Sequence, residues 1–67
     1  MTTTTYTYDF NGKSFRREFC SLGSITIYVN NLHARYYDCG SIGLFMAENQ
    51  FLMQLAEQNV NYSKEIK

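Results

Sequence analysis

An Asn-Gly pair, Asn11-Gly12, separates two stretches in which aromatic and polar residues alternate. Alternation with a period of two is typical of β-strands, whose successive side chains point to opposite faces. Asn-Gly favours a type I′ turn, because both central residues of that turn need a positive φ. Residues 3–10 and 13–20 are therefore predicted to form a β-hairpin.

A two-residue turn at this place also sets the register of the hairpin. The pairs predicted to face each other are Phe10 with Lys13, Tyr8 with Phe15, Tyr6 with Arg17, and Thr4 with Phe19. All of these side chains lie on one side of the ribbon, so the aromatic residues share one face. We expect that face to be core rather than a base-stacking platform, because exposing the rings would forfeit most of the available apolar burial.

A second alternating segment, residues 24–29, is followed by Asn30-Asn31, and Asn tolerates the left-handed conformation of a tight turn. A return strand over residues 32–38 completes a second hairpin. Its predicted inner face is Ile25, Ile27, Val29, Leu32, Ala34 and Tyr36, and its outer face is Thr26, Tyr28, His33, Arg35 and Tyr37. A competing interpretation uses Asn30 or Asn31 as the cap of a short helix over Leu32–Tyr37.

The remainder of the chain predicts one helix, over residues 42–59, with Ser41 as its N-cap. At 100° per residue the apolar stripe of this helix is Leu44, Ala47, Phe51, Leu52 and Leu55, flanked by Phe45 and Ala56. Residues 60–67 are polar, with Val60 and Tyr62 alternating. We expect this segment to be a frayed tail, and a short edge strand is the alternative.

A sheet with one apolar face and a single amphipathic helix can hide both surfaces only by packing together. The predicted fold class is therefore α+β: two layers, an antiparallel sheet of three or four strands built from two hairpins, and one C-terminal helix on the apolar face. At 67 residues the chain is expected to form a single domain.

Six basic and six acidic residues give a formal net charge of zero, which argues against duplex binding and against attraction to a membrane surface. The sequence has no apolar run of membrane-spanning length and no signal-peptide pattern at its Thr-rich start. We expect a soluble, cytoplasmic protein.

Catalytic and metal-binding patterns find little support in the sequence. His33 is the only histidine, and with Cys20 and Cys39 it offers at most three zinc ligands at a spacing that matches no common zinc finger. The two cysteines are expected to be reduced thiols at strand ends. No glycine-rich phosphate loop or paired-carboxylate motif is present, so the prediction is a protein that is not an enzyme and uses no cofactor or metal.

Two surfaces are candidates for binding a partner. The first is the outer sheet face, with Tyr28, His33, Arg35, Tyr37 and Arg16, since Tyr and Arg are enriched among interface hot spots. A solvated sheet face of Thr, Tyr and Arg is the structural alternative.

The second candidate surface is a helix stripe of Met46, Met53 and Val60, which recur every seven residues on the side opposite the core. Scattered exposed apolar residues are the alternative here. Glu48 projects near the middle of the apolar stripe, where its carboxylate needs a partner or a raised pKa, and Arg17 or Lys13 could reach it.

These features predict a small protein-binding module, acting as a steric inhibitor or regulator of a protein of unknown identity. In size and character, though in no motif, it is similar to the small inhibitors that phages and mobile elements encode against host enzymes or immune complexes. One alternative is single-stranded nucleic-acid binding through the outer sheet face, where Tyr28, Tyr37 and His33 stack bases and Arg35 and Arg16 contact phosphates; zero net charge disfavours it. Another is a homodimeric structural subunit that pairs through its helix.

Overall fold

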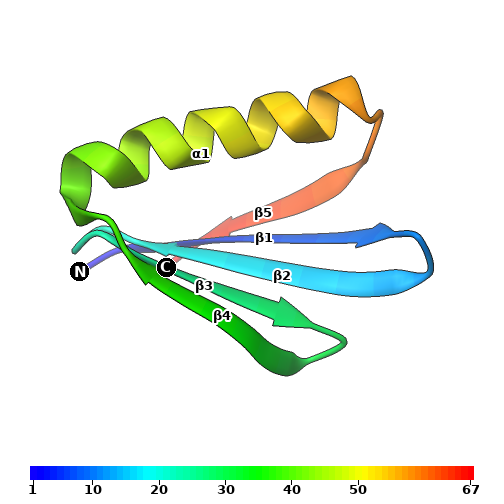
Figure 1. The fold of residues 1–67 in the computed structure, drawn as a ribbon, viewed down its shortest axis with the longest axis horizontal. Helices are drawn as coiled ribbons and strands as arrows, with labels where there is room; N and C mark the ends of the chain where they lie inside the picture. The colour runs from blue at the N-terminus through cyan, green and yellow to red at the C-terminus, as the bar shows by residue number, and fades with distance from the viewer.

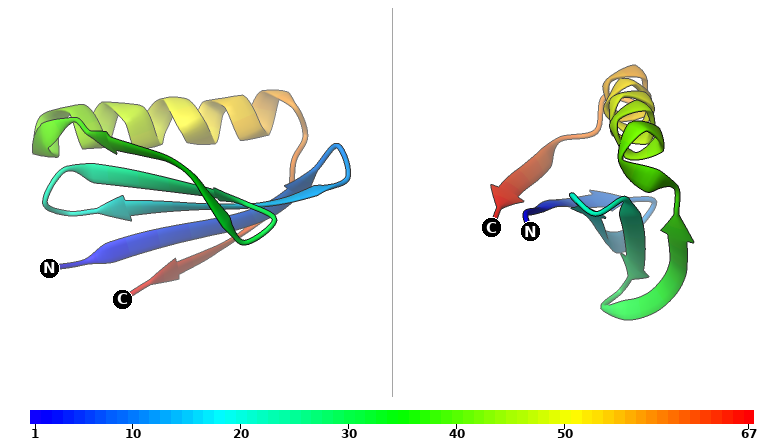
Figure 2. Two further views of the ribbon diagram at one scale, coloured as in Figure 1. Left: turned by 60° about the horizontal axis from the view of Figure 1, so that its bottom comes forward. Right: turned by 90° about the vertical axis from the view of Figure 1, so that its left-hand side faces the viewer.

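The computed structural model describes residues 1–67 and contains five strands and one helix (Figure 1). The strands are β1 (Thr3–Phe10), β2 (Lys13–Cys20), β3 (Ser24–Val29), β4 (Leu32–Asp38) and β5 (Tyr62–Ile66), and the helix α1 spans Gly40–Glu57. Every pairing is antiparallel, and the strand order is β4-β3-β2-β1-β5. α1 lies over one face of the sheet (Figures 1 and 2). The predicted two-layer α+β architecture is confirmed, with five strands instead of three or four.

Both predicted tight turns form, one at Asn11-Gly12 and the other at Asn30-Asn31. Asn11 and Gly12 have φ angles of 52° and 75°, and Asn30 and Asn31 have 51° and 67°, so each turn has positive φ at both central positions, as a type I′ turn requires. The register of the first hairpin is the predicted one in all four pairs. Residues 32–38 form a strand, so the competing helix over this segment is wrong.

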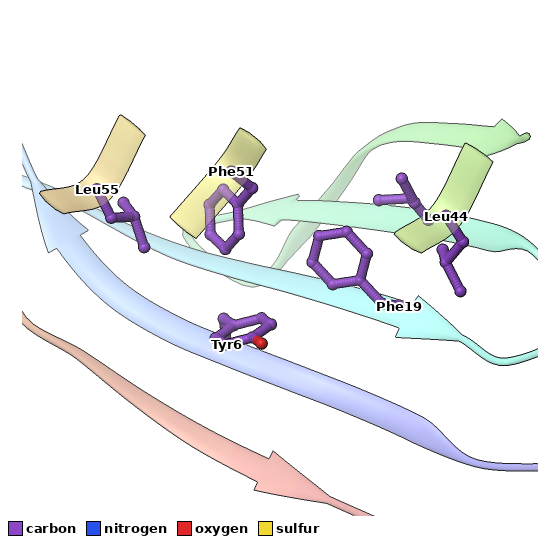
Figure 3. Packing of buried hydrophobic residues seen from close by; sticks show 6 residues of the cluster. Tyr6, Phe19, Leu44, Phe51 and Leu55 are labelled. Carbon is purple, nitrogen blue, oxygen red and sulfur yellow. The ribbon is translucent and has the colours of Figure 1, made fainter. Parts of the chain in front are cut away.

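The core lies between α1 and the inner faces of β1, β2 and β3 (Figure 3). Its buried members are Tyr6, Phe19, Ile25, Leu44, Phe51 and Leu55. Tyr6 is fully buried, and its ring makes edge-on contacts with Phe19 at 5.7 Å and Phe51 at 5.4 Å between centroids. Edge-to-face packing of this kind stabilises a core beyond the area it buries. The aromatic face of the first hairpin therefore packs against the helix, as predicted.

The helix begins earlier than the sequence predicts, at Gly40 instead of Ile42. Cys39 occupies the N-cap position without a side-chain capping bond, and Ser41, the predicted cap, lies within the first turn. The Cys39 backbone N–H donates to the Gly23 carbonyl at 2.8 Å, which ties the helix start to the β2–β3 turn. This tertiary hydrogen bond satisfies the N–H of the N-cap residue itself, so the start of α1 is fixed by a contact with a distant turn and not by a capping side chain.

The helix ends in a Schellman motif, which overturns the prediction of a frayed tail over residues 60–67. Asn59 is left-handed at φ 55°, its N–H donates to the Ala56 carbonyl at 3.2 Å, and the Val60 N–H donates to the Leu55 carbonyl at 2.9 Å. This motif reverses the chain and directs it back along the sheet, where β5 pairs with β1. Asn59 thus ends the helix that was predicted to include it.

β5 extends the sheet beyond β1, with all five of its residues exposed. Tyr62 pairs with Tyr8, and its ring meets the edge of Tyr6 at 5.5 Å between centroids. The partner strand is more than 50 residues away in the chain, and the alternation of Tyr62, Lys64 and Ile66 is only partly apolar. The short edge strand that was the alternative to a frayed tail is the one that forms. α1 lacks the length and apolar character that crossing a membrane requires.

Candidate functional site

β4 is exposed along its whole length, as is β5 at the other edge of the sheet. All seven residues of β4 are exposed, including Leu32 at 73%, Tyr36 at 59% and Tyr37 at 42%. β4 is an edge strand, and the core contacts of α1 stop at β3. The β3–β4 hairpin twists away from the helix, and its turn is far from α1 in each view (Figures 1 and 2). Both faces of β4 are consequently open to solvent.

A β-bulge in this hairpin changes the predicted faces of β4. Tyr28 pairs with His33 as expected, but the next residue of β3, Ile27, pairs with Arg35, so Ala34 is an extra residue without a partner. One extra residue reverses the parity of everything beyond it. Thr26 consequently pairs with Tyr36, and Ser24 pairs with Asp38.

The reversed parity redistributes three of the predicted side chains. Arg35 and Tyr37 lie on the helix side of the sheet, because they pair with Ile27 and Ile25, and the prediction that they face outward is wrong. Tyr36, predicted to be core, pairs with Thr26 and lies on the outer face, 59% exposed. No sequence signal marks this bulge, because Ala is compatible with a regular strand as well as with a bulge.

The outer face brings together three of the five predicted sheet-face residues. The guanidinium carbon of Arg16 stands 4.0 Å from the centroid of the Tyr28 ring, and the His33 ring meets Tyr28 edge-on at 5.8 Å. The Arg16 Nε lies 3.5 Å from Oε2 of Glu18 and is shielded from solvent without a hydrogen-bond partner. These residues form a cation-π and aromatic cluster in the middle of the face.

On the helix side of β4, Arg35 Nη1 donates to the Tyr37 hydroxyl at 2.6 Å. This hydrogen bond raises the pKa of Arg35 above its usual range. Tyr37 borders an open hollow of about 310 Å³ between β4 and α1. Arg17 also borders the hollow, with its guanidinium carbon 4.3 Å from the Phe51 ring centroid.

Two of the three residues of the predicted helix stripe, Met46 and Met53, are exposed on the side of α1 away from the core. Met46 and Met53 are 59% and 62% exposed. Val60 follows the helix, is half-buried and packs against the core at Leu55, so its placement on the stripe is wrong. The reason is the Schellman motif, in which the residue after the left-handed position folds back onto the last turn.

Two further residues on this side of α1 were missed by the sequence prediction. Ile42 is 82% exposed and Phe45 is 68% exposed, although Phe45 was assigned to the flank of the core stripe. Asn49, also exposed, lies between Phe45 and Met53 in helical angle. A count by heptads would have found them, since 42, 45, 46, 49 and 53 follow a spacing that keeps them on one side. We call this surface, Ile42, Phe45, Met46, Asn49 and Met53, the outer helix face.

Glu48 has a specific partner, which is neither Arg17 nor Lys13. The Tyr6 hydroxyl donates to Glu48 Oε2 at 2.5 Å from beneath the helix. Burial of the phenol raises the pKa of Tyr6 above its usual range, and the hydrogen bond and negative charge of Glu48 raise it further. Glu48 therefore serves as a link between α1 and β1.

The titratable groups form no metal site: no three His, Cys, Asp or Glu side chains cluster closely enough to hold an ion. Cys20 and Cys39 are free thiols, and the Cys39 Sγ lies 3.4 Å from the Gly23 carbonyl oxygen. No protein-family model, curated protein or solved structure matches this chain.

Proposed function

We propose that this chain is a non-enzymatic protein-binding module whose contact surface is the β3–β4 hairpin. The observation that carries the proposal is the complete exposure of β4, with Leu32, Tyr36 and Tyr37 open to solvent. A chain of 67 residues has few large apolar side chains to spare from its core. A strand that exposes such residues on both faces is better suited to binding a partner protein than to packing in the core of its own domain.

The chemistry of the hairpin supports a protein partner. Tyr and Arg are the residue types most enriched in interface hot spots, because they combine large contact area with hydrogen-bonding capacity. Arg35 and Tyr37 present such groups on one side, and Arg16, Tyr28 and His33 on the other. The outer edge of β4 pairs with no other strand, so a partner's strand could add to the sheet there.

The mode of action that suits this surface is steric. A rigid hairpin on a small two-layer domain occupies another protein's working surface without chemistry of its own. This is the mode of the small inhibitors that phages and mobile elements direct against host enzymes or immune complexes, and the proposal assigns this chain a role of that kind.

Affinity purification from the cells that naturally make the protein tests the proposal. Tyr28→Ala disrupts the outer side of the hairpin, Tyr37→Ala disrupts the helix side, and Ser63→Ala on the opposite edge strand is the matched control. We expect at least one hairpin variant to lose a partner that the wild type and the control retain. Binding of that partner to the purified variant should fall at least tenfold, about 1.4 kcal/mol, as for a hot-spot residue.

Thermal unfolding of each purified variant separates loss of binding from loss of fold. If every folded variant, including one that combines Tyr28→Ala with Tyr37→Ala, recovers the wild-type partners in wild-type yield, the hairpin is not the contact surface.

A second function is favoured by one observation on the outer face. Arg16, Tyr28, His33 and Tyr36 lie there together, and a cation among aromatic rings can bind single-stranded nucleic acid by stacking. Titration of a labelled oligothymidylate at increasing salt distinguishes the two functions. Nucleic-acid binding should weaken steeply with ionic strength, whereas a protein contact through aromatic residues should respond modestly.

A further inference from the structure

We propose that the outer helix face binds the same face of a second copy of this chain, with the two helices antiparallel about a twofold axis at Asn49. This inference does not depend on the proposed function of the hairpin. It begins from an imbalance in α1: the side away from the core carries large exposed apolar residues, as a helix buried on both sides would.

The apolar area of this face is large for so small a protein. Ile42, Phe45, Met46 and Met53 are between 59% and 82% exposed. With roughly 150–250 Å² for a large side chain, four such residues present about 500 Å². Complete burial of these residues in two copies would remove about 1,000 Å² from solvent, which reaches the lower threshold for a biological interface before any other residue is counted.

The charge of the face favours a second copy as its occupant. α1 contains no Lys or Arg, and its only charged residues are Glu48 and Glu57. Glu48 is turned toward the sheet by its hydrogen bond with Tyr6, and Glu57 is the last residue of the helix. Two such faces can meet without repulsion between like charges, and antiparallel helices also oppose their dipoles favourably. A charged partner would find no complementary group here.

The residues of the face are arranged symmetrically about Asn49. Positions four and seven residues before it and after it lie on this side of the helix. These positions hold, in chain order, Ile42, Phe45, Met53 and Ala56, whereas Leu52, three residues after Asn49, packs against the core. In an antiparallel pair, each residue meets the one at the same distance on the other side of Asn49, which is the reciprocal contact that a twofold interface requires.

The resulting contacts are complementary in size. Phe45 meets Met53, an adaptable side chain that makes favourable sulfur-aromatic contacts. Ile42, the most exposed residue of the face, meets Ala56, whose small side chain leaves room for it. Asn49 meets its own copy on the axis, where two amides can each donate to and accept from the other. A single Asn at such a position sets the register of a helix pair.

A dimer of this kind leaves the β3–β4 hairpins free. Their turns lie far from α1, on the other side of the molecule (Figure 2). Each dimer would then display two contact surfaces, and a partner with repeated sites would be bound with higher avidity than by one chain.

Sedimentation equilibrium of the full chain over a range of concentrations tests the proposal. The wild type should reach twice its chain mass of 7.8 kDa as concentration rises. Asn49→Asp and Asn49→Lys should each be monomeric, since like charges then meet on the axis, and an equimolar mixture of the two should recover the dimer mass. Gln50→Asp, which adds the same charge at the adjacent exposed position of α1, is the matched control and should remain dimeric.

A charge pair tests the orientation of the helices. Phe45→Glu or Met53→Lys alone should dissociate the dimer, and the two together in one chain should restore it, because antiparallel pairing brings positions 45 and 53 together. Circular dichroism checks that each variant is folded. A wild type that stays monomeric at all concentrations, a dimeric Asn49→Asp, a mixture that stays monomeric, or a monomeric double variant would each overturn the proposal.

Discussion

The hydroxyl of Tyr6, at the centre of β1, donates a 2.5 Å hydrogen bond to Oε2 of Glu48 in the middle of α1. It joins the two layers through a fully buried ring and a half-buried carboxylate. Hydrogen bonds to charged groups contribute more to stability than neutral ones, and a carboxylate left beneath a helix without a partner costs its full desolvation. The pair therefore fixes the position of α1 on the sheet. It also makes the free energy of unfolding depend on pH in the alkaline range.

Tyr6→Phe should lower the free energy of unfolding by about 1.5–3 kcal/mol, because it removes the donor and leaves Glu48 unpaired. Urea denaturation at pH 7 measures the change. Tyr28→Phe, which removes an outer-face hydroxyl that makes no hydrogen bond within the chain, is the control and should stay within about 0.5 kcal/mol of the wild type. Combining Tyr6→Phe with Glu48→Leu should recover part of the loss; equal stability of Tyr6→Phe and wild type would contradict the role of the bond.

Stability should also fall in alkali because of Tyr6. Its pKa is raised in the folded state, whereas in the unfolded chain a tyrosine titrates near 10. The contribution is therefore complete below about pH 10 and is lost as pH rises toward the folded pKa, by about 1.4 kcal/mol per pH unit for one proton. Urea denaturation between pH 9 and 11 should show a steeper decline for the wild type than for Tyr6→Phe. Parallel declines would mean that Tyr6 does not control this region.

Gly23→Ala should be among the most destabilising single substitutions. Gly23 has φ +107°, and a Cβ there would stand 2.6 Å from the Cα and carbonyl carbon of Gly40, where α1 begins. Gly12→Ala is the matched control: Gly12 also has a positive φ, at +75°, but a Cβ there meets nothing within 4 Å. The control should lose about 1–2 kcal/mol from backbone strain, and Gly23→Ala clearly more. Equal thermal shifts in the two variants would rule out the contact as the cause.

Tyr62→Ala should destabilise the protein by about 1–2 kcal/mol, because the Tyr62 ring covers the edge of Tyr6 from β5. Ile66→Ala, on the same face of the same strand but 60% exposed, should cost less than about 0.5 kcal/mol. Chemical denaturation of both variants makes the comparison. If Tyr62→Ala proved as stable as Ile66→Ala, β5 would not contribute to the core.

Deletion of Ala34 should leave the register of β4 unchanged on both sides of the bulge. Without the extra residue, His33 and Arg35 become neighbours opposite Tyr28 and Ile27, which is a regular antiparallel ladder. Nuclear Overhauser contacts between Thr26 and Tyr36 should persist in the deletion variant. Contacts between Thr26 and Arg35 in the wild type, in place of those between Thr26 and Tyr36, would contradict the bulge at Ala34.

Much of the fold could be predicted because it depends on local chemistry. Asn11-Gly12 and Asn30-Asn31 select tight turns by their tolerance of positive φ, and each turn sets the pairing next to it. The aromatic face of the first hairpin follows from strand parity alone, and the helix stripe follows from helical periodicity. These features need no information from distant parts of the chain.

The candidate sites were predicted less completely, because their geometry depends on choices that no local pattern encodes. Arg16, Tyr28 and His33 lie on the predicted face, since they precede the bulge or stand outside the strand that contains it. Arg35 and Tyr37 do not, because a single unpaired residue reverses the parity of the strand beyond it. Val60 left the helix stripe because a left-handed Asn59 ended the helix just before it.

The sequence by itself determined the two hairpins, the apolar sides of sheet and helix, and the uncharged outer side of α1, because turn preference, parity and periodicity act between neighbouring residues. Only the tertiary structure decided that β5 closes the sheet against β1, that Gly23 sets the helix start, and that Glu48 pairs with Tyr6. Each of these is a contact between distant segments, formed only once the layers pack and backbone and side chains must satisfy each other's hydrogen bonds and volume.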